Sequence, residues 1–136
     1  MDNNTQDGRG KFRFRLDGRS GVPVYRQLID QVHTAISTGV LRPADQLPTV
    51  RQVAVELTIN PNTVLRAYRE MEIRGVLETQ QGTGTFVAVW QPEATETERA
   101  ERLRKIVSEF VAQAGAAGLT VDELMKALKE MRGKAG

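Results

Sequence analysis

Apolar residues recur at helical spacing in three stretches of the first half of the chain. These stretches cover residues 24–38, 49–57 and 60–72. Gly39 follows the first stretch, where a glycine commonly ends a helix. Gln52 stands three positions after the threonine that opens the second stretch, which is capping-box spacing. The pattern predicts three short helices, of which the last two are separated by a tight turn.

A hairpin is predicted directly after the third helix. Gly75 ends that helix, and residues 76–79 and 85–89 read as strands on either side of the glycine-rich residues 80–84. Two short helices joined by a tight turn form a helix-turn-helix, whose second helix reads DNA. The hairpin then has the position of the wing in a winged helix. Its glycine-rich tip lets the backbone approach a phosphate or the minor groove, although turn geometry alone also accounts for the glycines.

Apolar and basic residues alternate in the N-terminal stretch 11–16. A strand there would turn Phe12, Phe14 and Leu16 toward the domain and its arginines toward solvent. Two interpretations of those arginines stay open: a charged edge strand that resists aggregation, and an arm that contacts phosphate. We favour the edge strand, because arginine on the outer face of such strands is common. Residues 1–10 are polar and predict a disordered tail.

The polar face of the third helix carries side chains that suit a DNA major groove. Asn60 is the expected N-cap, and Pro61 fits the first helical turn, where its missing N–H costs nothing. Asparagine can pair with adenine, threonine can meet a thymine methyl group, and arginine can reach guanine or phosphate. We therefore expect this helix to read bases and the hairpin tip to approach the DNA backbone. The residues assigned to DNA binding on these grounds are Asn60, Asn62, Thr63, Arg66, Gly82, Thr83 and Gly84.

Two further amphipathic helices are predicted in the last third of the chain, after a boundary marked by Trp90 and Pro92. The first covers residues 96–114, and the second starts at the capping box of Thr120 and Glu123. Together they are too short to close a core alone, so their apolar stripes need a partner. The DNA-binding domain or a second copy can supply it. A second copy is favoured, because helix-turn-helix regulators usually bind two-fold related half-sites. The expected dimer interface contains Leu103, Ile106, Val107, Phe110, Leu124, Met125 and Leu128.

Charge and composition narrow the class of function. The net charge of the 136-residue chain is only +2, but residues 9–19 hold five basic residues and one acid. From residue 91 onward, eight basic residues balance eight acidic ones, so the positive charge lies on the half predicted to bind DNA. The chain has no cysteine, one histidine and no recognisable catalytic or phosphate-binding motif. We expect no catalytic site, no metal site and no cofactor.

These patterns divide the chain into a tail of residues 1–10, a winged-helix DNA-binding domain of residues 11–90 and a helical dimerisation region of residues 91–136. The predicted fold class is α+β, a winged helix-turn-helix with a C-terminal two-helix dimerisation region. No apolar run approaches the length of a membrane span, and the polar N-terminus lacks a signal-peptide core. The expected localisation is cytoplasmic, with no membrane partner.

A set of short motifs runs through residues 22–88 in a fixed order. They are Pro23-Val24-Tyr25, Gln27-Leu28, Gly39-Val40-Leu41, Leu47-Pro48-Thr49-Val50-Arg51, Thr63-Val64, Ala67-Tyr68, Glu72, Gly75 and Gly82-Thr83-Gly84-Thr85-Phe86-Val87. With this set, about half of the chain resembles the DNA-binding domain of the GntR family of bacterial transcription regulators. The resemblance implies that Arg51 corresponds to a DNA-contacting arginine, which reads a base or clamps a phosphate.

One position departs from the family pattern. Many members carry Ser-Arg where this chain has Asn60-Pro61, and the arginine there often contacts DNA. Pro61 cannot replace that arginine, so the base preferences should differ from those of such members. The Asn-Pro-Asn-Thr version with a short C-terminal part resembles the YtrA-like branch. The resemblance to that branch implies transporter operons as frequent targets. With the predicted helix-turn-helix and C-terminal helices, we expect a homodimeric repressor of its own or a neighbouring operon.

Two other functions stay open. A winged helix can serve as a protein-contact module in a larger assembly, but the face of Arg51, Asn62 and Arg66 would then be expected to show an apolar patch. A ligand sensor needs a pocket of roughly 300 Å³ or more, and the two C-terminal helices leave little room for one within a subunit. A small-molecule effector at the dimer interface stays open. The expected partners are a double-stranded DNA operator and a second copy of the chain.

Overall fold

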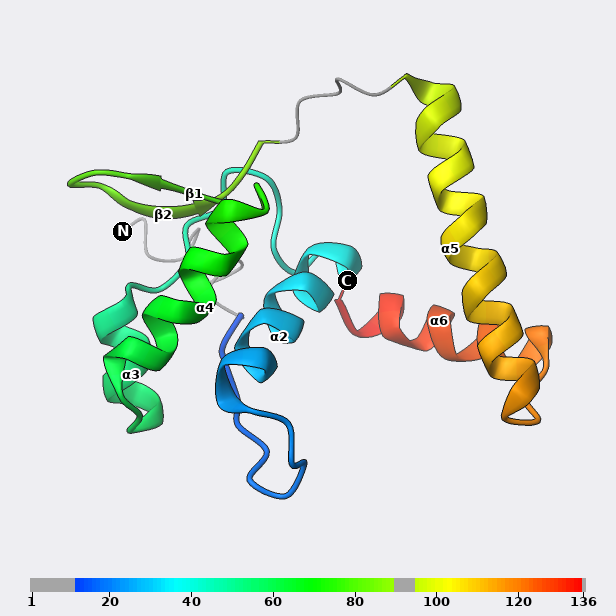
Figure 1. Ribbon diagram of the computed structural model, residues 1–136, viewed down its shortest axis with the longest axis horizontal. Coiled ribbons are helices and arrows are strands. Elements are labelled where there is room, and N and C mark those ends of the chain that lie inside the picture. The colour runs from blue at the N-terminus through cyan, green and yellow to red at the C-terminus, as the bar shows by residue number, and fades with distance from the viewer. Residues whose placement is uncertain (1–11, 90–94, 136) are drawn as a thin grey trace. The chain divides into compact units, whose positions relative to one another are not determined.

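The computed structural model describes residues 12–89 and 95–135 (Figure 1). The chain divides into two compact units, Met1–Val89 and Trp90–Gly136, which are described separately below. The disorder expected for residues 1–10 and the boundary expected at Trp90 and Pro92 lie outside the described residues.

The three helices predicted for the first unit are present. They are α2 (Val24–Thr38), α3 (Val50–Leu57) and α4 (Pro61–Ile73). The capping box of α3 forms as expected, because Thr49 Oγ1 accepts from Gln52 N at 3.0 Å and Gln52 Oε1 accepts from Thr49 N at 2.8 Å. Gly39 ends α2 in the left-handed conformation with φ of 87°. Local signals were therefore sufficient to locate these helix ends.

The wing consists of two antiparallel strands, β1 (Leu77–Gln80) and β2 (Gly84–Val87), with Leu77 opposite Val87. Each strand lies within about a residue or two of its predicted limits. A third extended segment, not predicted, runs along β2: Ala44 N donates to Val87 O and Leu47 N donates to Thr85 O, both at 2.8 Å. Two helices followed by this hairpin confirm the winged-helix fold (Figure 1).

The core of the first unit lies where α2, α3, α4 and the wing meet. Each large apolar side chain buried in this core contributes roughly 1.5–3 kcal/mol to the free energy of unfolding. Tyr68 ties α4 to the start of α3, because its hydroxyl donates to Pro48 O at 2.6 Å. Burial raises the pKa of Tyr68, so its hydroxyl stays protonated as the donor. The largest fully buried side chains are Leu28, Ile29, Val32, Val53, Val64 and Met71.

The strand predicted at residues 11–16 is wrong for the described residues 12–16. The alternation itself holds, since Phe14 is buried while Phe12 and Leu16 pack partly buried against the core. The segment is extended but pairs with no strand. Instead, two glutamines of α2 bond its backbone: Arg15 N donates to Gln31 Oε1 and Asp17 N donates to Gln27 Oε1, each at 2.9 Å. Backbone groups need partners, and here glutamine amides replace a neighbouring strand.

The second unit contains α5 (Glu96–Ala116) and α6 (Val121–Ala135). The predicted capping box of α6 forms, with Glu123 N donating to Thr120 Oγ1 at 3.2 Å. A matching box at Thr95 and Glu98 starts α5, and the hydrogen bond from the Thr95 backbone lowers the pKa of Glu98. Among the side chains described in this unit only Ala114 is buried, so the two helices have no core of their own. No helix in the described ranges is long and apolar enough to span a membrane.

Candidate nucleic-acid interface

The face of α4 that points away from the core presents the polar residues proposed to read DNA. Val64, Ala67, Tyr68 and Met71 form its buried face. Asn62 and Arg66 are exposed, as predicted, and Thr63 is half-buried. With Leu65, Arg69, Glu70 and Ile73, the exposed pair lines a shallow surface hollow.

Asn60 has a structural role at the start of α4. Its Oδ1 accepts from Asn62 N at 2.8 Å, which satisfies one of the free N–H groups of the first turn. The amide nitrogen Nδ2 of Asn60 is not used in this cap and can donate to DNA. The side chain of Asn62, one position beyond Pro61, extends from the same turn into solvent.

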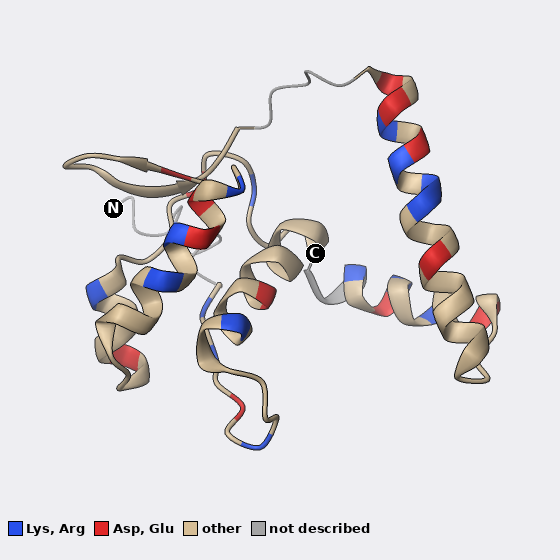
Figure 2. Cartoon of the chain, in the orientation of Figure 1, with Lys and Arg blue, Asp and Glu red and all other residues tan. Residues whose placement is uncertain are grey.

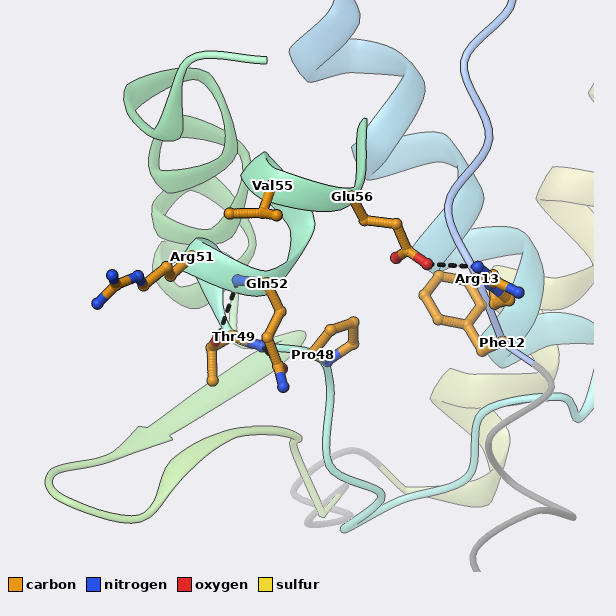
Figure 3. A pocket seen from close by; sticks show the side chains of 8 residues that line it. All are labelled: Phe12, Arg13, Pro48, Thr49, Arg51, Gln52, Val55 and Glu56. Carbon is orange, nitrogen blue, oxygen red and sulfur yellow. Dashed lines mark hydrogen bonds and ion pairs between the residues drawn. The ribbon is translucent and has the colours of Figure 1, made fainter. Parts of the chain in front are cut away.

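Arg51 lies on the first turn of α3 and is exposed. The segment before it runs along β2, so α3 begins beside the wing. Figure 3 shows the Arg51 side chain pointing away from the domain, whereas Thr49 and Gln52 close the capping box next to it. In Figure 2, Lys and Arg colour the start of α3, and both signs of charge occur along α4 and along α5.

Figure 3 also shows the open hollow between α3 and the N-terminal segment. Its volume is about 720 Å³, and Phe12, Pro48 and Val55 supply its apolar lining. Arg13 forms an ion pair with Glu56 at its rim. The ion pair with Glu56 explains why Arg13 points outward, so no contact with a phosphate is needed to account for its position. Within residues 12–89 and 95–135, no group of three potential metal ligands gathers, and His33 is half-buried on α2.

The wing tip is held by a side chain that the sequence pattern did not single out. Gln46 Nε2 donates to Thr83 O at 3.2 Å. Gly82 and Gly84 have φ of 80° and 142°, so both positions favour glycine. The two differ in surroundings: a Cβ on Gly84 would lie 2.5 Å from Gln46 Nε2, whereas a Cβ on Gly82 would meet nothing within 4 Å.

This difference predicts unequal effects of two alanine substitutions. Gly82→Ala should lose roughly 1–2 kcal/mol of unfolding free energy, because alanine is strained at positive φ. Gly84→Ala should lose about 1 kcal/mol more, because its methyl group displaces Gln46 from Thr83. Urea unfolding of the two variants measures the gap. In a Gln46→Ala background the gap should narrow, and a gap of unchanged size would contradict the role given to Gln46.

The residues expected at a dimer interface lie on α5 and α6. Six of the seven are exposed, among them Leu103 at 60% and Phe110 at 43%, and Leu124 is half-buried.

Sequence reasoning missed two polar features of the first unit: the contact of Gln46 with the wing, and a stack of Arg66 on Tyr25. Both join residues distant in sequence, so spacing carried no signal of them.

Comparisons with known proteins agree with this arrangement. The family model described as "Bacterial regulatory proteins, gntR family" matches residues 24–87. The chain is 37% identical to YhcF, an uncharacterized HTH-type transcriptional regulator of Bacillus subtilis, over 82% of this chain and 91% of YhcF. It is 32% identical to the HTH-type transcriptional repressor YtrA of Bacillus subtilis, over 86% of this chain and 90% of YtrA. A crystal structure titled as a transcriptional antiterminator from Listeria monocytogenes superimposes with a TM-score of 0.64, at 27% identity, over 88% of this chain and 89% of that one.

Proposed function

The chain belongs to the GntR family of bacterial regulatory proteins and is a DNA-binding regulator of transcription, and we propose that it acts as a homodimeric repressor. Its target in this proposal is an operator of its own gene or of a neighbouring operon, with a transporter operon as one candidate. The single observation that carries the DNA-binding role is the α4 face with Asn62 and Arg66 exposed beside a wing. The site of action is the cytoplasm.

The composition of the proposed reading face supports DNA over a protein partner. Arg51, Asn62 and Arg66 are exposed there and can donate to bases or phosphates. A protein-contact module would be expected to expose a continuous apolar patch on this face. Exposed Ile73 and half-buried Leu65 are the apolar residues of the hollow on α4, where Asn62, Arg66, Arg69 and Glu70 supply the polar lining. We therefore assign DNA contacts to Arg51, Asn60, Asn62, Thr63 and Arg66, with the wing tip at Gly82, Thr83 and Gly84.

Dimerisation is proposed from the uncovered apolar residues of the second unit. Leu103, Ile106, Val107 and Phe110 lie at helical spacing along α5, and Met125 and Leu128 are exposed on α6. Burying each such side chain contributes roughly 1.5–3 kcal/mol, so several pairs can exceed an association cost of about 4–15 kcal/mol. A second copy suits this surface, because an isologous contact holds two recognition helices at one spacing.

The repressor role rests on similarity to YtrA, which is named as a repressor and matches over most of its length. A repressor of this kind excludes other proteins from the DNA that it occupies, and so needs no catalytic group.

The proposal predicts that the protein binds a duplex from upstream of its own coding sequence more tightly than a scrambled duplex of equal length. The logarithm of the binding constant should fall with the logarithm of salt concentration, with a slope of about −0.9 for each phosphate neutralised. Fluorescence anisotropy at several salt concentrations measures both quantities. Equal affinity for all promoter fragments and for scrambled DNA at moderate salt would contradict a role as a sequence-specific regulator.

A further inference from the structure

The guanidinium of Arg66 stacks on an aromatic ring of a different helix. Its Cζ lies 3.7 Å from the centroid of the Tyr25 ring. Tyr25 is the second residue of α2 and is half-buried against the core, whereas Arg66 is exposed on α4. The Cζ of Arg26 lies farther from the same ring, at 5.8 Å. The short distance of the Arg66 contact indicates a planar stack rather than a distant attraction of charge.

The acid nearest to Arg66 along α4 does not compete for it. Glu70 stands four positions later, the spacing at which an ion pair with Arg66 would be expected. Its Oε2 instead lies 3.9 Å from Arg26 Nη2 and 3.8 Å from Arg74 Nη2. Both arginines approach the same carboxylate oxygen of Glu70. The Tyr25 ring is thus the contact that orients the Arg66 guanidinium.

A stacked guanidinium remains able to bind DNA. Stacking uses the flat face of the group, whereas its N–H donors lie in the plane and point outward at the edge. That edge is what guanine O6 and N7, or a phosphate, accept from. A free arginine samples many rotamers and must lose that freedom on binding, while one held on a ring has lost part of it beforehand.

We propose that Tyr25 is a positioning residue for DNA recognition, acting through Arg66. The inference rests on the proposed DNA-reading role of Arg66 and adds a residue of the first helix to the recognition apparatus. In this arrangement the ring, not the phenolic hydroxyl, is the functional part of Tyr25. The hydroxyl makes no contact with the DNA.

A double-mutant cycle on the full-length protein tests the proposal. The probes are a labelled duplex from upstream of the coding sequence and a scrambled duplex. Tyr25→Leu keeps an apolar side chain against the core but removes the ring, and should weaken binding to the upstream duplex about threefold to fivefold. Tyr25→Phe is the matched control and should bind as the wild type does. In an Arg66→Ala background, Tyr25→Leu should have no further effect.

Two further measurements examine the stack from the side of Arg66. Arg66→Lys keeps the charge and leaves α2 untouched, but its ammonium group cannot stack as a plane. It should lose at least as much affinity as Tyr25→Leu, because lysine also lacks the planar edge that contacts the DNA. In the protein without DNA, NMR should show the Arg66 side-chain protons shifted upfield by the ring current, and Tyr25→Leu should remove that shift. Thermal unfolding of each variant verifies the fold.

The outcomes separate this inference from the proposed function. If the wild type prefers the upstream duplex but Tyr25→Leu weakens binding equally with and without Arg66, the positioning role is wrong. Weakening by Tyr25→Phe would show that the hydroxyl contacts DNA directly, and unchanged binding by Arg66→Lys would show that stacking has no role. If the wild type shows no preference for the upstream duplex, the proposed function fails first and this inference fails with it.

Discussion

Ending the chain after Val89 is expected to yield a folded monomer that binds operator DNA roughly 10²–10⁴-fold more weakly than the full-length protein. The fold should survive because, among the residues that the structure describes, the buried residues of the main core lie between Phe14 and Val87. The affinity should fall because two linked recognition helices bind with a high effective concentration that a single one lacks. Sedimentation equilibrium at micromolar concentration measures the mass, and anisotropy titration measures the affinity.

A single substitution separates loss of the interface from loss of the whole unit. Phe110→Asp places a charge on the apolar stripe of α5 and should give a monomer with the affinity of the shortened chain. Ser108→Asp is the matched control, since Ser108 is exposed on the same helix but lies off the stripe. It should stay a dimer. A shortened chain that remains dimeric would place the interface within residues 1–89 and overturn the assignment of α5 and α6.

Replacing Asn62 by alanine should cost about 1–3 kcal/mol of binding free energy on the cognate operator and relax specificity at one base pair. The side chain is exposed on the first turn of α4 and has the donor and acceptor that pair with adenine. Affinities for an operator and for its single-base variants give the specificity at each position. An unchanged ratio of cognate to scrambled binding would exclude Asn62 as a base reader.

Two other substitutions, one at the N-cap of α4 and one at the wing tip, act as controls for that result. Asn60→Ala removes the N-cap and should lose about 0.5–2 kcal/mol of unfolding free energy, whereas Asn62→Ala should leave the unfolding free energy almost unchanged. Thr83→Ala changes the wing tip and should weaken binding to all sequences to a similar degree. Asn60→Ala is thus expected to lower stability, whereas Asn62→Ala is expected to lower specificity.

The chain's helices and their ends followed from its sequence, because the forces that set them act over a few residues. Gln52 bonds back to Thr49, Asn60 caps the turn that Pro61 begins, and Gly39 adopts the left-handed conformation that ends α2. Apolar periodicity then defined which face of each helix is buried. The ordered motifs of residues 22–88 were enough to identify the family before any fold was known, and the family match over residues 24–87 confirmed it.

Contacts between distant segments depended on the tertiary structure. The alternation of residues 12–16 correctly indicated which side chains face the core, but no local signal specifies what bonds an extended backbone, and the glutamines of α2 took that role. The segment before α3 joined the wing for the same reason, with Gln46 reaching Thr83. Arg66 and Tyr25 are 41 positions apart, and only the packing of α4 on α2 brings the guanidinium over the ring. Periodicity records the environment of a residue, whereas the identity of its partner is set by how the chain folds back on itself.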